Sequence, residues 1–413
     1  MFSSSSTTPR AASASAPCAA RGVPPPPPWV VIPEEAGCSR SFTLISIPTQ
    51  QGFRWTPPGG AGLRCVGSNG GWLAGAYIDA DRTVRVSLVN PLTNARVDMP
   101  ASGRVSFVPH NEHHQPEVER LLANAVQKVA FAPDPTAQSF FVAVVGVTRS
   151  RVPASFGIVF ARAGKEKGWC AYAKIHDVDE RSRRYYSAPR VDVAYHDGKF
   201  YYMTRGQLWV VDMAAPSPSP APLAKFKPTL PSRVSDHDSY HLAFSGDGAL
   251  HVVSSKTDGH SVCDFDMFAQ RYDGPASHSP RGSSEWTSTT CLHGQCFLLG
   301  DFNQTLCVPT DGTAWLKPDS VYFASIMLCS LLAKYRVCRG GTDGVWQFKL
   351  DTGHIERPEY FQKLRFRPSL EFWRPAWSRH KDDMLEEEVW ERLKSGLDWS
   401  KAIWFMPSMR SMA

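Results

Sequence analysis

The stretch VDVAYHDGKFYYMTRGQLWVVD, residues 191–212, decides the fold of this chain. Apolar runs rich in β-branched and aromatic residues flank the pair Asp197-Gly198. An Asp-Gly pair supplies the positive φ angles of a two-residue type I′ turn, so the stretch predicts a β-hairpin. A second stretch of the same kind, HLAFSGDGALHVVS, follows at residues 241–254. The chain therefore repeats a hairpin pattern.

The spacing of these turns predicts the architecture. Gly198 and Gly248 lie about 50 residues apart, and Asp343-Gly344 lies about twice that distance further on, which is the range of a propeller repeat. One four-stranded sheet cannot bury both of its faces alone, so such sheets pack around a channel. We therefore expect an all-β fold, a single β-propeller of six or seven blades over residues 29–413.

One segment near the C-terminus departs from the β pattern. Its apolar residues recur four apart, as on one face of a helix, at Leu385, Val389 and Leu393. An aspartate at 382 or 383 can cap the N-terminus, and Gly396 can end the last turn. We expect one short C-terminal helix there, packed on the outside of the ring.

Composition limits the classes of partner. The 413 residues are 42% hydrophobic and carry a formal net charge of +6. This mild basic excess favours an acidic protein partner, but it is not the clustered charge of a nucleic-acid-binding protein. Residues 181–186 combine arginines with two tyrosines, a combination that could suit RNA. A solvated loop is the favoured interpretation, because the run is so short. We expect no membrane segment, because no apolar stretch approaches the ~18 residues that a membrane helix needs.

The first 28 residues form a separate unit. They are rich in Ser and Ala, contain Arg10 and Arg21, and no acidic residue precedes Glu34. Two interpretations stay open, an organellar transit peptide and a disordered low-complexity leader. The localisation is open in the same way, between cytoplasm or nucleus and plastid or mitochondrion.

Several segments together resemble the KIB-type β-propeller domain, a plant family long described as a domain of unknown function and often linked to an F-box. They occur in the family's order at residues 29–33 (WVVIP), 65–73 (CVGSNGGWL), 88–93 with 99–100, 192–201 (DVAYHDGKFY), 292–300, 321–323 and 404–408 (WFMPS). No single segment is specific to this family, but seven segments in the family's order are. The resemblance implies a propeller, and the last segment predicts a strand that completes a sheet begun near residue 29.

The chain departs from the F-box members of this family in one respect. Those members carry a helical segment of about 45 residues before the propeller, long enough for a few helices, whereas 28 low-complexity residues precede Trp29 here. The resemblance therefore implies a member that appears without an F-box. We expect no direct contact with a ubiquitin-ligase adaptor.

No catalytic constellation emerges from the sequence. It contains no G-x-S-x-G elbow, P-loop, H-E-x-x-H helix or EF-hand loop. Three polar clusters are best interpreted as loops or strand ends, and they lie at residues 236–241, 112–114 and 291–296. The ten cysteines form no C-x-x-C pair and predict reduced thiols. We expect no catalytic residue, no metal ion and no cofactor.

The sequence thus favours a non-catalytic protein-interaction scaffold. The alternative is a carboxylate-based hydrolase of the propeller class, which needs paired carboxylates converging at the channel mouth. For the scaffold, we expect binding through Arg181–Tyr186 and Tyr201-Tyr202, since Arg and Tyr are enriched at binding hot spots. We also expect Trp72, Trp209 and Trp346 to be buried between blades.

Overall fold

The computed structural model describes residues 27–33, 39–49, 51–58, 62–99 without 82, 122, 125–148, 155–163, 169–177, 191–225 without 205–206, 239–256, 264–270, 286–323 without 301, 312 and 314, 345–356 without 353, 367–368 and 403–407. The predicted C-terminal helix and the 1–26 part of the leader lie outside these residues, as does the pair Asp343-Gly344. No helix among the residues described is long and apolar enough to cross a membrane.

The described strands form six sheets, four with four strands and two with five. One sheet contains β1 (Trp29–Pro33), β2 (Phe42–Ser46), β3 (Gln51–Trp55), β25 (Arg367–Pro368) and β26 (Ile403–Phe405). The second contains β4 (Arg64–Asn69), β5 (Trp72–Ile78), β6 (Val84–Val89) and β7 (Arg96–Asp98). The third contains β8 (Lys128–Phe131), β9 (Phe141–Thr148), β10 (Ser155–Arg162) and β11 (Trp169–Asp177).

The other three sheets follow in chain order. The fourth contains β12 (Val193–His196), β13 (Lys199–Thr204), β14 (Gln207–Asp212) and β15 (Ala221–Lys225). The fifth contains β16 (Ser239–Phe244), β17 (Leu250–Lys256), β18 (Asp264–Gln270) and β19 (Thr287–Ser288). The sixth contains β20 (Gln295–Leu299), β21 (Leu306–Pro309), β22 (Ser320–Phe323), β23 (Trp346–Lys349) and β24 (His354–Glu356), with β20 and β22 parallel.

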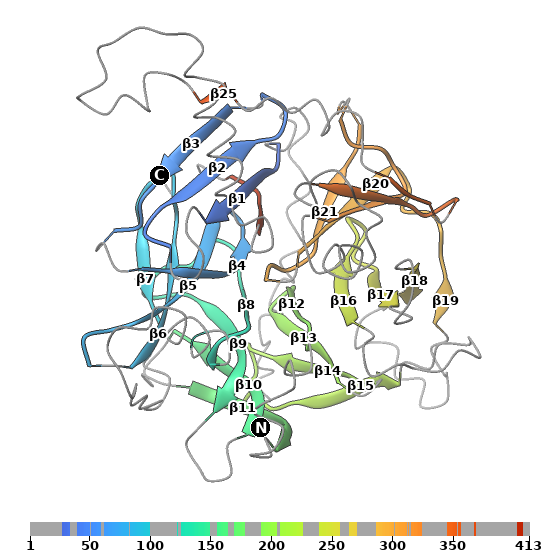
Figure 1. The fold of residues 1–413 in the computed structure, drawn as a ribbon. Coiled ribbons are helices and arrows are strands. Elements are labelled where there is room, and N and C mark those ends of the chain that lie inside the picture. The colour runs from blue at the N-terminus through green and yellow to red at the C-terminus, as the bar shows by residue number, and fades with distance from the viewer. Residues whose placement is uncertain are drawn as a thin grey trace, which may run out of the picture.

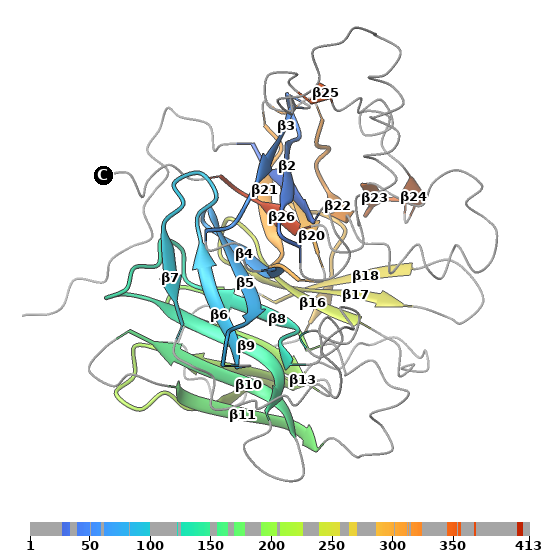
Figure 2. The same ribbon diagram turned by 60° about the vertical axis from the view of Figure 1, so that its left-hand side comes forward.

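The sheets lie around a common centre (Figure 1). The inner strand of each sheet contacts the inner strand of a neighbour, as β4 does with β8 and β8 with β12. Figure 2 shows the order within one sheet from another side, with β8, β9, β10 and β11 following one another. This arrangement confirms the predicted all-β propeller.

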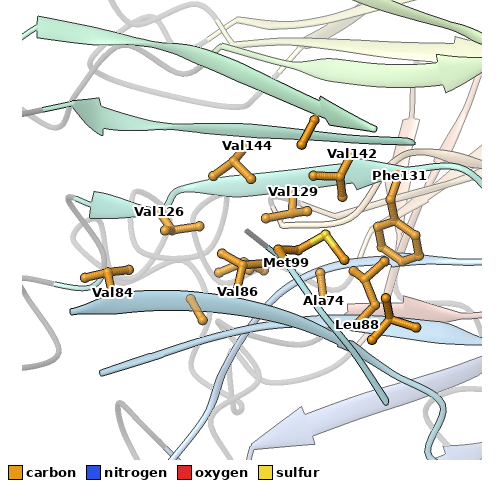
Figure 3. Close-up of a cluster of buried hydrophobic side chains, with 14 of the residues drawn as sticks. Ala74, Val84, Val86, Leu88, Met99, Val126, Val129, Phe131, Val142 and Val144 are labelled. Carbon is orange, nitrogen blue, oxygen red and sulfur yellow. The ribbon is translucent and has the colours of Figure 1, made fainter. Parts of the chain in front are cut away.

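A hydrophobic cluster fills each gap between neighbouring sheets. Figure 3 shows the one between the second and third sheets, where Val86 and Leu88 of β6 face Val129 of β8 and Val142 of β9. Five further clusters join the remaining pairs of neighbours, including the sixth sheet with the first. The core is therefore a ring of interfaces in which each sheet buries both faces, as the repeat length predicted.

Ring closure depends on the two ends of the described chain. β26 pairs antiparallel with β1, and Val30 lies opposite Trp404. The predicted completion of the first sheet by residues 404–408 is thus confirmed for Trp404 and Phe405. Trp404 is fully buried, and its indole N–H donates to the carbonyl of Leu299 at 2.9 Å.

The two Asp-Gly turns have different outcomes. Asp197 and Gly198 have φ angles of 45° and 76°, and His196 pairs with Lys199, which confirms the type I′ turn. The second prediction is wrong in its turn type. Residues 245–249 form a longer loop, in which Gly248 has a positive φ and the Asp247 carboxylate accepts from the Ser245 hydroxyl. Ser245 supplies the side-chain hydrogen bond that makes the longer loop favourable.

The predicted tryptophans are not all buried. Trp72 is buried in the cluster between the second and third sheets. Trp209 is only half-buried, and its ring stacks on Tyr202 at a centroid distance of 6.2 Å. It lies on β14, the third strand from the channel, where the gap between sheets opens toward solvent. The side chain of Trp346 lies outside what the structure describes.

Replacing Trp404 tests the closure. We expect Trp404→Ala to lower the free energy of unfolding by about 3–5 kcal/mol, the range for emptying a large aromatic site. Trp209→Ala is the matched control, and it should cost less than half as much because part of that ring already contacts water. Denaturant titration measures both variants. If both variants lost the same unfolding free energy, the result would contradict a ring closure that depends on β26.

His251 makes stability depend on pH. It is buried on β17, its Nε2 lies 3.1 Å from the Ser245 hydroxyl, and its ring packs edge-on against Phe297 of the next sheet. Burial lowers the pKa of His251 from 6.5 to about 4, although the nearby Asp247 acts in the opposite direction. The unfolded chain therefore binds the proton first, and folding stability falls as pH drops from about 6.5 toward 4.

The expected loss from His251 between pH 7 and pH 5 is about 2 kcal/mol, since one unit of pKa difference is worth about 1.4 kcal/mol. His251→Gln removes the titrating group. Between pH 7 and pH 5, the unfolding free energy of this variant should therefore fall by about 2 kcal/mol less than that of the wild type. Denaturant titrations at the two pH values give the comparison. Parallel pH dependence in both proteins would show that His251 is not buried as a neutral ring.

Candidate functional site

Polar side chains link the inner strands around the channel. Asp192, just before β12, forms an ion pair with Lys128 of β8, and both side chains are 4% exposed. The same carboxylate accepts the backbone N–H of Leu242 on β16 at 2.5 Å. One buried carboxylate therefore connects three neighbouring sheets, and its hydrogen bonds offset the cost of burying the charge.

Other inner strands are joined in the same way. Arg64, at the start of β4, donates to the carbonyl of Val126 at 2.6 Å. Asn69, at the end of that strand, donates to the carbonyl of Phe131 at 2.7 Å. The Ser68 hydroxyl donates to the carbonyl of Trp404. These bonds pair polar groups that the channel wall would otherwise leave unsatisfied.

The segment between β20 and β21 lies inside the channel. Phe302 packs under the guanidinium of Arg64, whose carbon is 5.0 Å from the ring centroid. Two residues later, the Gln304 side chain makes two hydrogen bonds of 2.9 Å with the backbone of Tyr195, one to its N–H and one to its carbonyl. The segment thus connects the second and fourth sheets. We call residues 302–305 the channel segment.

Burial along the channel segment shows how closely it fills that space. Asn303 is fully buried and Thr305 is 4% exposed. A Cβ added to Gly300 would lie 1.9 Å from the Asn303 Oδ1, so any larger residue at this position would displace the Asn303 side chain. Asn303 begins a glycosylation sequon, but a fully buried side chain cannot accept a glycan. The channel segment therefore packs closely against the surrounding chain at Asn303 and Thr305, while Phe302 and Gln304 stay half-exposed.

The turns at the C-terminal ends of the inner strands meet on one side of the ring. Gly70 packs on Pro133, since a Cβ added to it would lie 2.8 Å from the proline Cβ. Between the fifth and sixth sheets, the Gly246 N–H donates to the Gln295 side chain at 3.0 Å. We call this surface, formed by residues 69–72, 132–141, 195–198 and 244–249, the hairpin-tip face.

Half-exposed aromatic rings lie along the hairpin-tip face. Phe141 and Tyr195 have centroids 6.4 Å apart, which joins the third and fourth sheets. His196 stacks on Phe244 at 4.1 Å with an interplanar angle of 7°, which joins the fourth and fifth. These four residues are the aromatic row. Their contacts come from different sheets, so the rings are fixed relative to one another.

Burial sets the protonation of the aromatic row. It lowers the pKa of His196, with Asp197 acting in the opposite direction, so the stacked imidazole is neutral near pH 7. Burial also raises the pKa of Tyr195, whose hydroxyl accepts the N–H of Gly198. The row therefore presents neutral rings, while its neighbour Asp197 is exposed.

The structure changes the predicted binding residues. Tyr201 and Tyr202 are buried in the core between sheets, so they cannot form the predicted contact surface. Both lie on β13, which has neighbours on either side and buries both faces. Residues 181–186 lie outside the described part. Sequence reasoning missed Phe141, Tyr195 and Phe244, although Tyr195 and Phe244 lie close to the Asp-Gly pairs that predicted the turns.

The polar clusters noted in the sequence lie only partly among the described residues. Residues 112–114 and 236–238 lie outside the described stretches, and His241 is buried on β16. Cys291 is exposed, whereas Cys296 is buried and burial raises its pKa. Within the described stretches, no group of three or more His, Cys, Asp or Glu could bind a metal ion.

Comparisons with known proteins agree with the fold. A family model described as the KIB1-4 β-propeller matches residues 44–348, from β2 to β23. No curated protein matches the chain.

Solved propellers resemble it more distantly. TolB from Acinetobacter baumannii is 10% identical with a TM-score of 0.36, and the match covers 79% of this chain and 62% of TolB, less than two thirds. An Aleuria aurantia lectin mutant in complex with α-methyl-L-fucoside is 8% identical with a TM-score of 0.31, covering 81% and 97%. The GH43 protein BlXynB from Bacillus licheniformis is 10% identical with a TM-score of 0.29, covering 70% and 48%. At TM-scores this low, the likeness carries no argument about function.

The ion pair in the channel makes a testable prediction. Lys128→Met leaves the Asp192 carboxylate buried without its partner and should cost about 3–5 kcal/mol of unfolding free energy. Asp192→Asn keeps an acceptor for Leu242. The double variant should therefore lose less than the sum of the two single variants, with a coupling above about 1 kcal/mol.

A half-exposed pair provides the control for this cycle. Arg85 and Asp79 are 2.6 Å apart but 32% and 20% exposed. Arg85→Met should cost no more than about 1 kcal/mol. Chemical denaturation measures all variants, and a Lys128→Met loss as small as that of Arg85→Met would show that the channel pair is solvated.

Proposed function

The chain belongs to the KIB1-4 β-propeller family, and we propose that it is a non-catalytic protein-interaction scaffold. We infer that each of the six sheets is one blade of the ring. The proposal rests above all on one observation: half-exposed aromatic rings from three sheets lie together on the hairpin-tip face.

The channel segment supports binding on the outside of the ring. Small-molecule sites are usually concave and bury most of the ligand. Here Phe302 and Gln304 contact the inner strands of two separate sheets, so the segment that carries them bridges these sheets. A ligand that entered the centre would have to break these contacts. A protein partner needs only the surface, which stays as rigid as the sheets beneath it.

The aromatic row has the properties of a protein contact. Half-exposed aromatic rings bury a large apolar area, and they lose little side-chain entropy when neighbouring rings already fix them. His196 and Phe244 are stacked before any partner binds. The net charge of +6 favours an acidic partner, because it speeds encounter with one and makes the association rate salt-sensitive.

The alternative, a carboxylate-based hydrolase, has less support. Such enzymes need two carboxyl groups that flank the scissile bond. Among the residues that the structure describes, Asp192 is the one buried carboxylate, and its oxygens are engaged by Lys128, Val193 and Leu242. A catalytic carboxylate must instead be able to reach substrate.

Variants of the aromatic row test the scaffold proposal. The tagged chain is used to capture partners from an extract of the source organism, and binding of the purified partner is then measured directly. We expect His196→Ala with Phe244→Ala to weaken that affinity at least tenfold, because both rings are lost from the contact. Circular dichroism and thermal unfolding confirm that the variant stays folded.

Tyr172→Ala is the control for surface aromatics. Tyr172 is 41% exposed on the outer strand β11, away from the hairpin-tip face. Its loss should leave the affinity unchanged within twofold. Equal affinity of the wild type and the double variant would contradict the proposed face. Glycoside hydrolysis by the purified chain that Asp192→Asn abolishes would favour the enzyme instead.

A further inference from the structure

The loop between β14 and β15 is held firmly at its base. The Arg162 guanidinium, from the neighbouring third sheet, donates to the carbonyls of Met213, Ala215 and Pro216 at 2.7–3.0 Å. The Ala214 N–H donates to the Asp212 carboxylate at 2.9 Å. The rest of the loop, P-S-P-S-P at residues 216–220, thus has a fixed position at the outer edge of the fourth sheet.

Within this loop, Ser219 differs from the other serine. Ser217 and Ser219 are both exposed and each precedes a proline, but Pro218 is buried whereas Pro220 is half-exposed. Residues 215–217 bend, and residues 218–220 continue without a bend into β15. Thr56 resembles Ser217, since it is exposed but Pro57 after it is buried. Of the Ser-Pro and Thr-Pro pairs in the described stretches, Ser219-Pro220 therefore combines an exposed hydroxyl with an accessible proline.

We propose that Ser219 is a phosphorylation site for a proline-directed protein kinase. Such a kinase binds an extended substrate and accepts proline after the serine, a residue with a fixed φ and no N–H to satisfy. The Ser219 oxygen attacks the γ-phosphorus of ATP, a new P–O bond forms, and the bond to ADP breaks. The kinase's catalytic aspartate accepts the hydroxyl proton. Accessibility of both Ser219 and Pro220 permits this without unfolding the sheet.

Phosphorylation would change the charge of this edge. A phosphoserine carries about −1.5 to −2 charges at pH 7, and here it would lie on a loop whose first residues are held by Arg162. This inference does not depend on the proposed binding face, because the loop lies on the outer edge of the ring and the aromatic row lies at the inner strand ends.

The test compares the folded chain with a synthetic peptide of residues 210–226. Both are incubated with ATP and a purified proline-directed kinase, and mass spectrometry locates the phosphate. In the peptide, both serines should react. In the folded chain, Ser219 should carry at least tenfold more phosphate than Ser217 or Thr56. Ser219→Ala and Pro220→Ala should each reduce labelling of the loop at least tenfold, and Ser217→Ala should change it less than twofold.

Three results would overturn the proposal. Labelling of Ser217 in the folded chain at a level equal to Ser219 would show that the buried proline does not restrict the kinase. A folded chain unlabelled at residues 214–220, beside a labelled peptide, would show that the fold blocks the site. A peptide that does not react would show that the sequence is no substrate for this class of kinase.

Discussion

The pairing of β26 with β1 is the constraint on which the rest of the structure depends. Ile403, Trp404 and Phe405 alternate sides along this short strand. Trp404 belongs to the cluster shared with the sixth sheet, whereas Ile403 and Phe405 belong to the cluster shared with the second. Three residues thus complete two interfaces. Without them, the first sheet would lose its inner strand and expose an unpaired edge.

A closed ring fixes what the centre can contain. Each inner strand contacts its neighbours, so polar groups on the channel wall need partners from within the ring. Asp192 meets this need with Lys128 and Leu242, and Gln304 meets it with Tyr195. The same contacts link sheets across the channel. The proposed partner surface lies instead at the strand ends, where the aromatic row lies.

The sequence predicted what depends on local pattern. The turn at Asp197-Gly198 followed from turn chemistry, which acts over a few residues, whereas the closing strand at Trp404 followed from the family resemblance. The turn at Asp247-Gly248 was wrong because the Ser245 hydroxyl forms a competing hydrogen bond with the Asp247 carboxylate. The prediction that Tyr201 and Tyr202 lie on the surface is wrong, because composition does not show that both faces of β13 are covered.

The candidate site was less predictable for the same reason. Gln304 and Tyr195 are 109 positions apart in the sequence, and no local signal marks their contact. The row formed by Phe141, Tyr195, His196 and Phe244 exists only once three sheets are in place. Family resemblance gave the fold but could not give this juxtaposition, since each ring by itself resembles an ordinary strand residue.

Native-state hydrogen exchange tests the central claim most directly. If the ring closes through β26, amides of β1 and β26 can exchange only when the ring opens. Their opening free energy should then equal that of the inner strand β8, whose amides report global unfolding. Exchange in β1 and β26 at a free energy several kcal/mol lower, with β8 still protected, would contradict this account, because the ring would then be stable without its closing strand.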